Sequence, residues 1–146
     1  MNLFKKYGTD ASAETTGVLI KVDEAVFRIK RAGGNNRAFR YSISKHAIKY
    51  REEFVKYGDL RSAGEIPPEI RARIAEVEDE IHQQAFADEV LAGWENVDGP
   101  DGSPLEFTRE NFLMLVRACP DVWQTLKTAA FDIDNFRAAD GAKLGE

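Results

Sequence analysis

The chain has 146 residues, of which 43% are hydrophobic and 31% charged, and its formal net charge is −5. This composition fits one globular domain with a buried core and excludes a disordered tail. No apolar run approaches the roughly 18 residues that a membrane span needs, and no signal-peptide core follows the N-terminal lysines. Cys119 is the single cysteine, which excludes an intrachain disulfide and favours a reducing cytoplasm.

The first element predicted in chain order is a β-hairpin. Residues 1–16 are polar and are expected to be a flexible terminus, like residues 139–146, so the single domain covers 17–138. β-Branched residues alternate with other residues over 18–29, with a break at Asp23-Glu24, which is typical of two paired strands. Asp-Glu is a poor pair for a tight turn, so the pattern leaves a longer loop open.

Helical periodicity follows the Gly/Asn break at 33–36. One apolar stripe predicts a helix that ends near Gly58, and proline at 67–68 suits the first turn of a second, longer helix. A second stripe, with a small shift, carries this long helix to Trp94. The first stripe consists of Phe39, Ile43, Ala47, Tyr50 and Phe54, and the second of Ile70, Ile74, Val77, Ile81, Phe86, Val90 and Trp94.

A turn at 98–104 separates the long helix from two more helices. Thr108 is the best N-cap in the chain, and Phe107 and Phe112 occupy the positions of a hydrophobic staple. Pro120 restarts a last helix, whose apolar stripe reaches Phe136. The predicted fold class is therefore α+β, mostly helical, with an N-terminal β-hairpin followed by about four helices.

The acidic turn is interpreted as a hinge rather than a metal site. An EF-hand loop needs oxygen ligands at positions one, three and five and glycine at six, and no register around Asp98 and Asp101 supplies them. Short carboxylates beside Gly and Pro are typical turn formers. The residues assigned to this structural hinge are Trp94, Asp98, Asp101, Phe107, Thr108 and Phe112.

No motif predicts enzyme chemistry. His46 and His82 lie far apart and outside any zinc-binding pattern, and Gly33-Gly34 lacks the frame of a phosphate loop. No Ser/His/Asp set is present, and the acidic residues of the long helix are typical of a solvated face. The expectation is a protein that is not an enzyme, with no catalytic residue, no metal and no cofactor.

Charge is distributed unevenly along the chain. The segment 28–61 carries ten Lys/Arg and three Asp/Glu, a net of +7, against −12 for the remainder. Such a segment can bind nucleic acid or an acidic protein; alternatively, it faces the acidic helices of its own chain or simply keeps a helix solvated. Because the periodicity buries its aromatic residues and the acidic remainder repels phosphate, no nucleic acid is expected. The candidate partner-binding residues around the Gly/Asn break are Arg28, Lys30, Arg31, Arg37 and Arg40.

Two stretches of the sequence resemble the tail assembly chaperones of long-tailed bacteriophages and their prophages. The first is AVFRIKRAGGNNRAFRYSISKHAIKYREEF, a strand ending in basic residues, a Gly/Asn break and a basic-aromatic helix. The second is VLAGWENVDGPDGSPLEFTRENFLMLVRACPDVWQTLKTAAFDIDNF, with its Gly-Trp, acidic turn, Pro-Leu-x-Phe-Thr and PDVW. The likeness spans roughly residues 17–136 and consists of hydrophobic anchors and turns. The segment DLRSAGEIPPEI matches no part of it.

The resemblance implies a non-enzymatic factor of the host bacterial cytoplasm that is absent from the mature virion. Its expected partners are the tape measure protein, which it would bind, and the tail tube protein, which it would recruit; no membrane is expected, and self-association stays open. A tape measure protein exposes long apolar helix stripes that aggregate unless covered. The alternatives are a small structural tail or head-completion protein of the virion and, third, a nucleic-acid-binding regulator.

Overall fold

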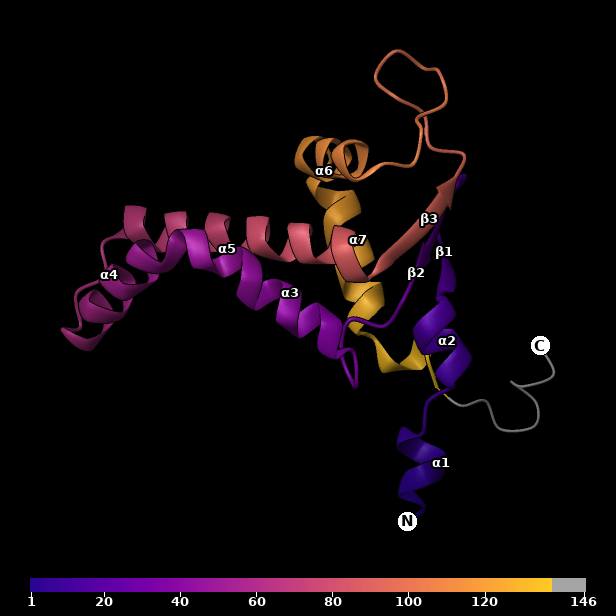
Figure 1. Cartoon of the computed structure of the whole chain (residues 1–146), viewed down its shortest axis with the longest axis horizontal. Coiled ribbons are helices and arrows are strands. Elements are labelled where there is room, and N and C mark those ends of the chain that lie inside the picture. The colour runs from indigo at the N-terminus through magenta and orange to yellow at the C-terminus, as the bar shows by residue number, and fades with distance from the viewer. Residues whose placement is uncertain (138–146) are drawn as a thin grey trace.

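The computed structural model describes residues 1–137 and places a small antiparallel sheet at one end of a largely helical molecule (Figure 1). The predicted α+β class, with an N-terminal hairpin before the helices, is confirmed. The elements in chain order are α1 (Leu3–Tyr7), α2 (Ala11–Thr16), β1 (Val18–Val22), β2 (Ala25–Ile29), α3 (Arg37–Ala47), η1 (Ile48–Tyr50), α4 (Arg51–Ser62), α5 (Pro68–Glu89), β3 (Leu91–Glu95), α6 (Arg109–Ala118), α7 (Pro120–Phe131) and η2 (Ile133–Asn135).

The sheet has the order β1-β2-β3, with both pairs antiparallel. The hairpin turn contains only Asp23 and Glu24, because Val22 pairs directly with Ala25. Asp23 takes a φ of 54°, in the left-handed region that tight hairpin turns require and that Asp tolerates better than most residues. The longer loop that the sequence left open is therefore not formed.

The third strand corrects the prediction that the long helix continues to Trp94. α5 ends at Glu89, and the chain then pairs with β2, with Trp94 opposite Phe27. A two-stranded sheet is marginal in water, and the third strand satisfies the second edge of β2. Gly93 is a poor helix former and Trp94 a good strand former, which favours this outcome over a continued helix.

One face of the sheet packs on the end of α5 and on α6 and α7, and this assembly is called the compact end. Phe27 and Ile29 point from β2 into the core. Phe86 of α5 is fully buried, stacks on Phe112 at 5.7 Å between ring centroids and meets the edge of Trp123 at 5.3 Å. The core of the described chain therefore joins residues from the sheet and from four helices, α3, α5, α6 and α7.

The other end of the molecule is a helical arm, formed by α3, η1 and α4 lying beside α5 (Figure 1). The single helix predicted from residue 37 to Gly58 is interrupted by the 3-10 turn η1, and its second part runs past Gly58 to Ser62. As a result, five α-helices rather than about four follow the hairpin in the described residues. Arg73 of α5 joins the two sides of the arm through an ion pair with Glu53, at 3.0 Å.

The N-terminal residues 1–16, expected to be flexible, contain α1 and α2. Asp10 caps α2 and its backbone N–H donates to the Phe136 carbonyl at 2.8 Å. Glu14 pairs with Arg31 at 3.1 Å. These contacts attach α2 to the compact end. Residues 139–146, also expected to be flexible, lie outside the described part of the chain.

Candidate protein-interaction surfaces

Three of the five basic side chains around the Gly/Asn break contact other groups of the described chain. Arg31 pairs with Glu14, and its guanidinium lies so close to Gly34, whose φ is 60°, that a Cβ there would meet it at 2.6 Å. Arg40 donates to the Gly34 carbonyl at 2.9 Å. Arg28 likewise donates to a carbonyl, that of Gly17, at 3.3 Å.

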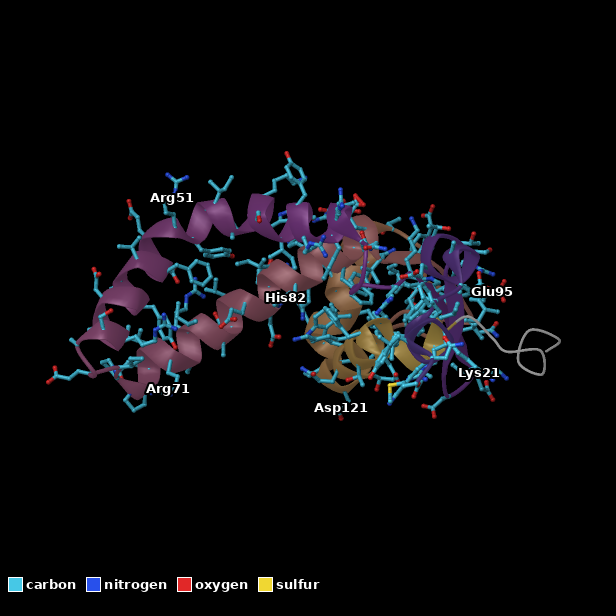
Figure 2. The ribbon with its side chains drawn as sticks, turned by 90° about the horizontal axis from the view of Figure 1, so that it is seen from below. Lys21, Arg51, Arg71, His82, Glu95 and Asp121 are labelled. Carbon is cyan, nitrogen blue, oxygen red and sulfur yellow. The ribbon has the colours of Figure 1, made fainter. Side chains whose placement is uncertain are left out.

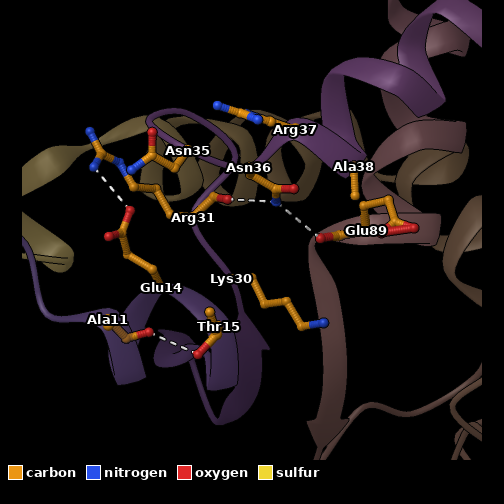
Figure 3. Close-up of a pocket in the computed structure, with 10 residues that line it drawn as sticks. All are labelled: Ala11, Glu14, Thr15, Lys30, Arg31, Asn35, Asn36, Arg37, Ala38 and Glu89. Atoms are coloured by element: carbon orange, nitrogen blue, oxygen red, sulfur yellow. Dashed lines mark hydrogen bonds and ion pairs between the residues drawn. The ribbon is translucent and has the colours of Figure 1, made fainter.

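Lys30 and Arg37 are the two members of this group whose side chains have no hydrogen bond or ion pair to the described residues. Both line a pocket of about 510 Å³ between α2, the Gly/Asn break and the start of α3 (Figure 3). Asn36 holds the break in shape, because its Oδ1 accepts from the Phe39 N–H and its Nδ2 donates to the Arg31 carbonyl. The pocket also contains the Glu14 carboxylate, so its charge is mixed.

The predicted hinge residues lie between a strand and a helix, since β3 replaces the end of the expected helix. Trp94 packs edge-on against Phe27 and Phe107, and its indole N–H donates to the Leu105 carbonyl at 2.9 Å. Phe112 belongs to the core, where it stacks on Phe86. Trp94 therefore ties the turn back to the sheet.

The acidic turn itself is a closed loop that projects from the end of β3 (Figure 1). Asp98 and Pro104 form an isolated β-bridge at its base. Asp101 accepts hydrogen bonds from the Ser103 N–H at 3.0 Å and its hydroxyl at 2.7 Å, and these bonds lower the pKa of Asp101. Thr108 caps α6 as expected, because its hydroxyl oxygen accepts from the Asn111 N–H. Both aspartates thus take part in turn structure.

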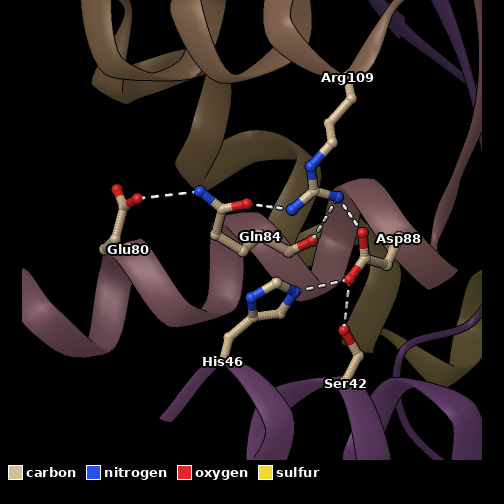
Figure 4. A network of polar contacts seen from close by, with 6 residues as sticks. All are labelled: Ser42, His46, Glu80, Gln84, Asp88 and Arg109. Atoms are coloured by element: carbon tan, nitrogen blue, oxygen red, sulfur yellow. Dashed lines mark hydrogen bonds and ion pairs between the residues drawn. The ribbon is translucent and has the colours of Figure 1, made fainter. Parts of the chain in front are cut away.

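A network of polar side chains joins the arm to the compact end (Figure 4). Asp88 of α5 accepts from Ser42 at 2.7 Å, is 2.7 Å from the His46 Nε2, and forms an ion pair with Arg109 at the start of α6. Gln84 continues the network, as it accepts from Arg109 and donates to another α5 carboxylate at 3.0 Å. One carboxylate thereby fixes α3 and α6 on opposite sides of α5.

The arm exposes large apolar side chains on its outer surface. Tyr41, Ile48 and Val55 are 72%, 60% and 58% exposed. They follow each other at steps of seven residues, which places them along one side of α3, η1 and α4. The seven-residue spacing is present in the sequence. It lies beside the apolar stripe from Phe39 to Phe54, which the helical periodicity assigns to the core.

Residues 1–137 contain neither a membrane-spanning helix nor a cluster of metal-binding side chains. No helix there is long and apolar enough to cross a membrane. No group of three or more His, Cys, Asp or Glu in the same range is arranged to hold a metal ion. Cys119, between α6 and α7, is a free thiol at the junction of two helices.

Residues 35–145 of the chain match the model of the YdaY prophage protein family. No curated protein and no solved structure matches the chain. The matched range begins in the Gly/Asn break and covers the arm, β3, the acidic loop, α6 and α7. It supports the prophage origin that the resemblance implies, and it extends over the surfaces described above.

Proposed function

The chain belongs to the YdaY prophage protein family, and from that premise we propose that it is a tail assembly chaperone that binds the tape measure protein. It acts without catalysis in the cytoplasm of the host bacterium and helps to recruit tail tube subunits. The proposal combines the prophage family with the resemblance of two stretches of the sequence to tail assembly chaperones. The described surface adds a physical reason.

The observation that carries the proposal is the exposure of Tyr41, Ile48 and Val55 on a helical arm. Exposed apolar groups along one side of a helix favour a helix-in-groove or helix-on-helix contact with another protein. A chaperone of a long helical protein needs such a surface, because it must cover apolar stripes before the assembled tail does. The arm extends away from the sheet, which leaves its outer side accessible (Figure 2).

The basic pocket supports the same proposal in a smaller way. The side chains of Lys30 and Arg37 have no hydrogen-bond or ion-pair partner among the described residues, so their charges are available to an acidic surface. Rim charges of this kind raise association rates more than they raise affinity. Reversal of both charges should therefore slow association with the tape measure protein and weaken its dependence on salt, while the melting temperature stays unchanged.

Co-expression with the tape measure protein from the same prophage, followed by pull-down, tests the proposal. A stable complex that keeps the tape measure protein soluble is expected. Analysis of purified virions separates the chaperone from the alternative of a structural tail or head-completion protein, since a chaperone should be absent from them. A protein that is retained in the virion and does not solubilise the tape measure protein contradicts the proposal.

A further inference from the structure

The exposed residues of the arm belong to a longer stripe with a regular composition. Starting from Arg37, steps of four, three, four, three and four residues reach Val55, which is the spacing of one side of a helix that contacts another helix. Apolar and polar residues alternate along these steps. We call this set the outer stripe; it consists of Arg37, Tyr41, Ser44, Ile48, Arg51 and Val55.

The outer stripe stays continuous across the 3-10 turn. A shallow hollow of about 400 Å³ lies at the bend between α3 and α4, and four residues of the stripe, Ser44, Ile48, Arg51 and Val55, line it. Phe54 adds an aromatic wall. Because Ser44 is small and η1 changes the direction of the chain, the hollow has room for a large side chain of an opposing helix.

The charges within the stripe, and those beside its α3 part, have one sign. Between residues 37 and 49 there are four Lys/Arg and no Asp/Glu. The guanidinium groups of Arg37 and Arg51, which lie within the stripe, have no hydrogen bond or ion pair to the described residues. Arg51 projects from the side of the arm turned away from α5 (Figure 2). Two arginines two heptads apart are therefore available to carboxylates on an opposing helix.

We propose that the outer stripe binds an amphipathic helix of a partner protein in which apolar residues recur every seven positions and acidic residues face Arg37 and Arg51. The apolar residues of that helix cover Tyr41, Ile48 and Val55, and one of them fills the hollow. The identification of this helix with part of the tape measure protein rests on the proposed function. The recognition chemistry itself follows from the arm alone.

A second copy of the chain fits the stripe less well. If two stripes packed on each other, the basic segment 37–49 and Arg51 of each copy would meet the neutral or basic surface of the other, because residues 51–62 carry three Lys/Arg and three Asp/Glu. Uncompensated arginines at the centre of a contact are costly. An acidic partner helix pairs the same arginines instead.

The test uses the full-length protein and two designed helical peptides of about three heptads. Both have leucine at every seventh position; one carries glutamate at the flanking positions and the other lysine. The acidic peptide should bind, with an affinity that falls as salt rises, and the basic peptide should bind at least about tenfold more weakly. The readouts are fluorescence anisotropy and the melting curve of each protein variant.

Three variants locate the contact. The double variant Ile48→Ser/Val55→Ser should weaken binding of the acidic peptide by about tenfold or more, because the apolar area is lost. Arg51→Glu should reverse the preference between the two peptides. Leu19→Ser is the matched control, since Leu19 is equally exposed, at 59%, but lies on β1 of the sheet; it should leave binding unchanged. All of these positions are exposed, so the melting temperatures should match the wild type.

Several outcomes would overturn the proposal. Equal binding of both peptides, or unchanged binding by the double variant, would remove the outer stripe as the docking surface. Self-association in sedimentation experiments that the double variant abolishes would make a second copy the occupant. The proposed function fails separately: a wild-type protein that binds the acidic peptide through the stripe but not the tape measure protein keeps this inference and loses that function. Stripe variants that still bind the tape measure protein keep the proposed function and remove the outer stripe as its docking surface.

Discussion

The compact end buries its large apolar side chains, whereas the arm exposes several of them on its outer side. At the compact end, α6 buries three residues in a helix of ten, and Phe86, Phe112 and Trp123 pack ring against ring. On the arm, α4 has twelve residues and none of them is buried. Its inner side is held to α5 by the ion pair between Arg73 and Glu53 and by partial packing, whereas its outer side exposes apolar groups.

This difference suggests that the compact end supplies most of the stability of the fold, whereas the arm supplies the surface for contact with another protein. Most of the free energy of folding must come from the compact end, because the buried apolar area lies there. The arm contributes less to the core and presents more surface, which is the arrangement expected of a segment that binds another protein. Substitutions at the two ends should therefore affect different measurements.

The largest effect is expected from Phe86→Ala. Phe86 is fully buried between two aromatic rings, so its truncation leaves a cavity and should lower the free energy of unfolding by about 3–5 kcal/mol. Urea unfolding followed by circular dichroism measures the change. Val55→Ala on the arm is the matched control and should cost less than about 0.5 kcal/mol. Similar losses in the two variants would contradict the division between the ends.

A smaller effect is expected at the junction of the two regions. Asp88→Asn removes the charge that Arg109 and His46 share, and should lower the free energy of unfolding by about 1–3 kcal/mol. Hydrogen exchange should show where the loss falls, with faster exchange in α3 than in the sheet. Glu76→Gln, on the exposed side of α5, should change stability by less than about 0.5 kcal/mol. An unchanged exchange rate in α3 would mean that Asp88 does not fix the arm.

Sequence reasoning predicts local structure well and misses what depends on distant partners. The cap at Thr108 and the proline at the start of α7 act within one turn, so the spacing of residues reveals them. β3 depends on an edge of β2 more than sixty residues earlier in the chain, and no local pattern shows that edge. For this reason the apolar stripe through Val90 and Trp94 predicts a helix that is longer than the observed α5, which ends at Glu89.

The candidate interaction surfaces are likewise only partly predictable from the sequence. The basic residues around the Gly/Asn break are visible in the sequence, but the contacts of Arg31 with Glu14 and of Arg28 with Gly17 are set by the tertiary fold. The sequence therefore identifies a basic group and cannot tell which cations remain unpaired. The seven-residue spacing of the exposed arm residues is present in the sequence, yet their exposure depends on which side of the arm α5 covers.

The pH dependence of stability should report on α5, which runs through both regions. Burial, with the Lys127 ammonium, lowers the pKa of His82 below its ordinary value of 6.5. The unfolded chain then binds more protons than the folded one as pH falls through 6.5, so this contribution to stability is present above that pH and is lost below it. The melting temperature should fall from about pH 7.5 to about 5.5, and His82→Gln should reduce the fall.

Burial and the Arg109 charge also lower the pKa of His46, whereas the Asp88 carboxylate, 2.7 Å from its Nε2, favours the charged ring. The two influences oppose each other, so the acid-induced loss should come mainly from His82. A wild-type melting temperature that rises on acidification would mean that the protonated histidines are stabilised in the folded state instead.

The smallest effect is expected in the acidic loop, which looks most like a ligand site in the sequence. Millimolar calcium should leave the melting temperature unchanged, because Asp101 already accepts two hydrogen bonds from Ser103 and Asp98 belongs to the bridge at the base of the loop. An ion that bound the folded protein would raise the melting temperature in proportion to the logarithm of its concentration. Asp101→Ala, which removes the turn contacts, should lower stability slightly with and without calcium alike. A rise of several degrees in the wild type that this variant loses would make the loop a cation site and remove its assignment as a purely structural turn.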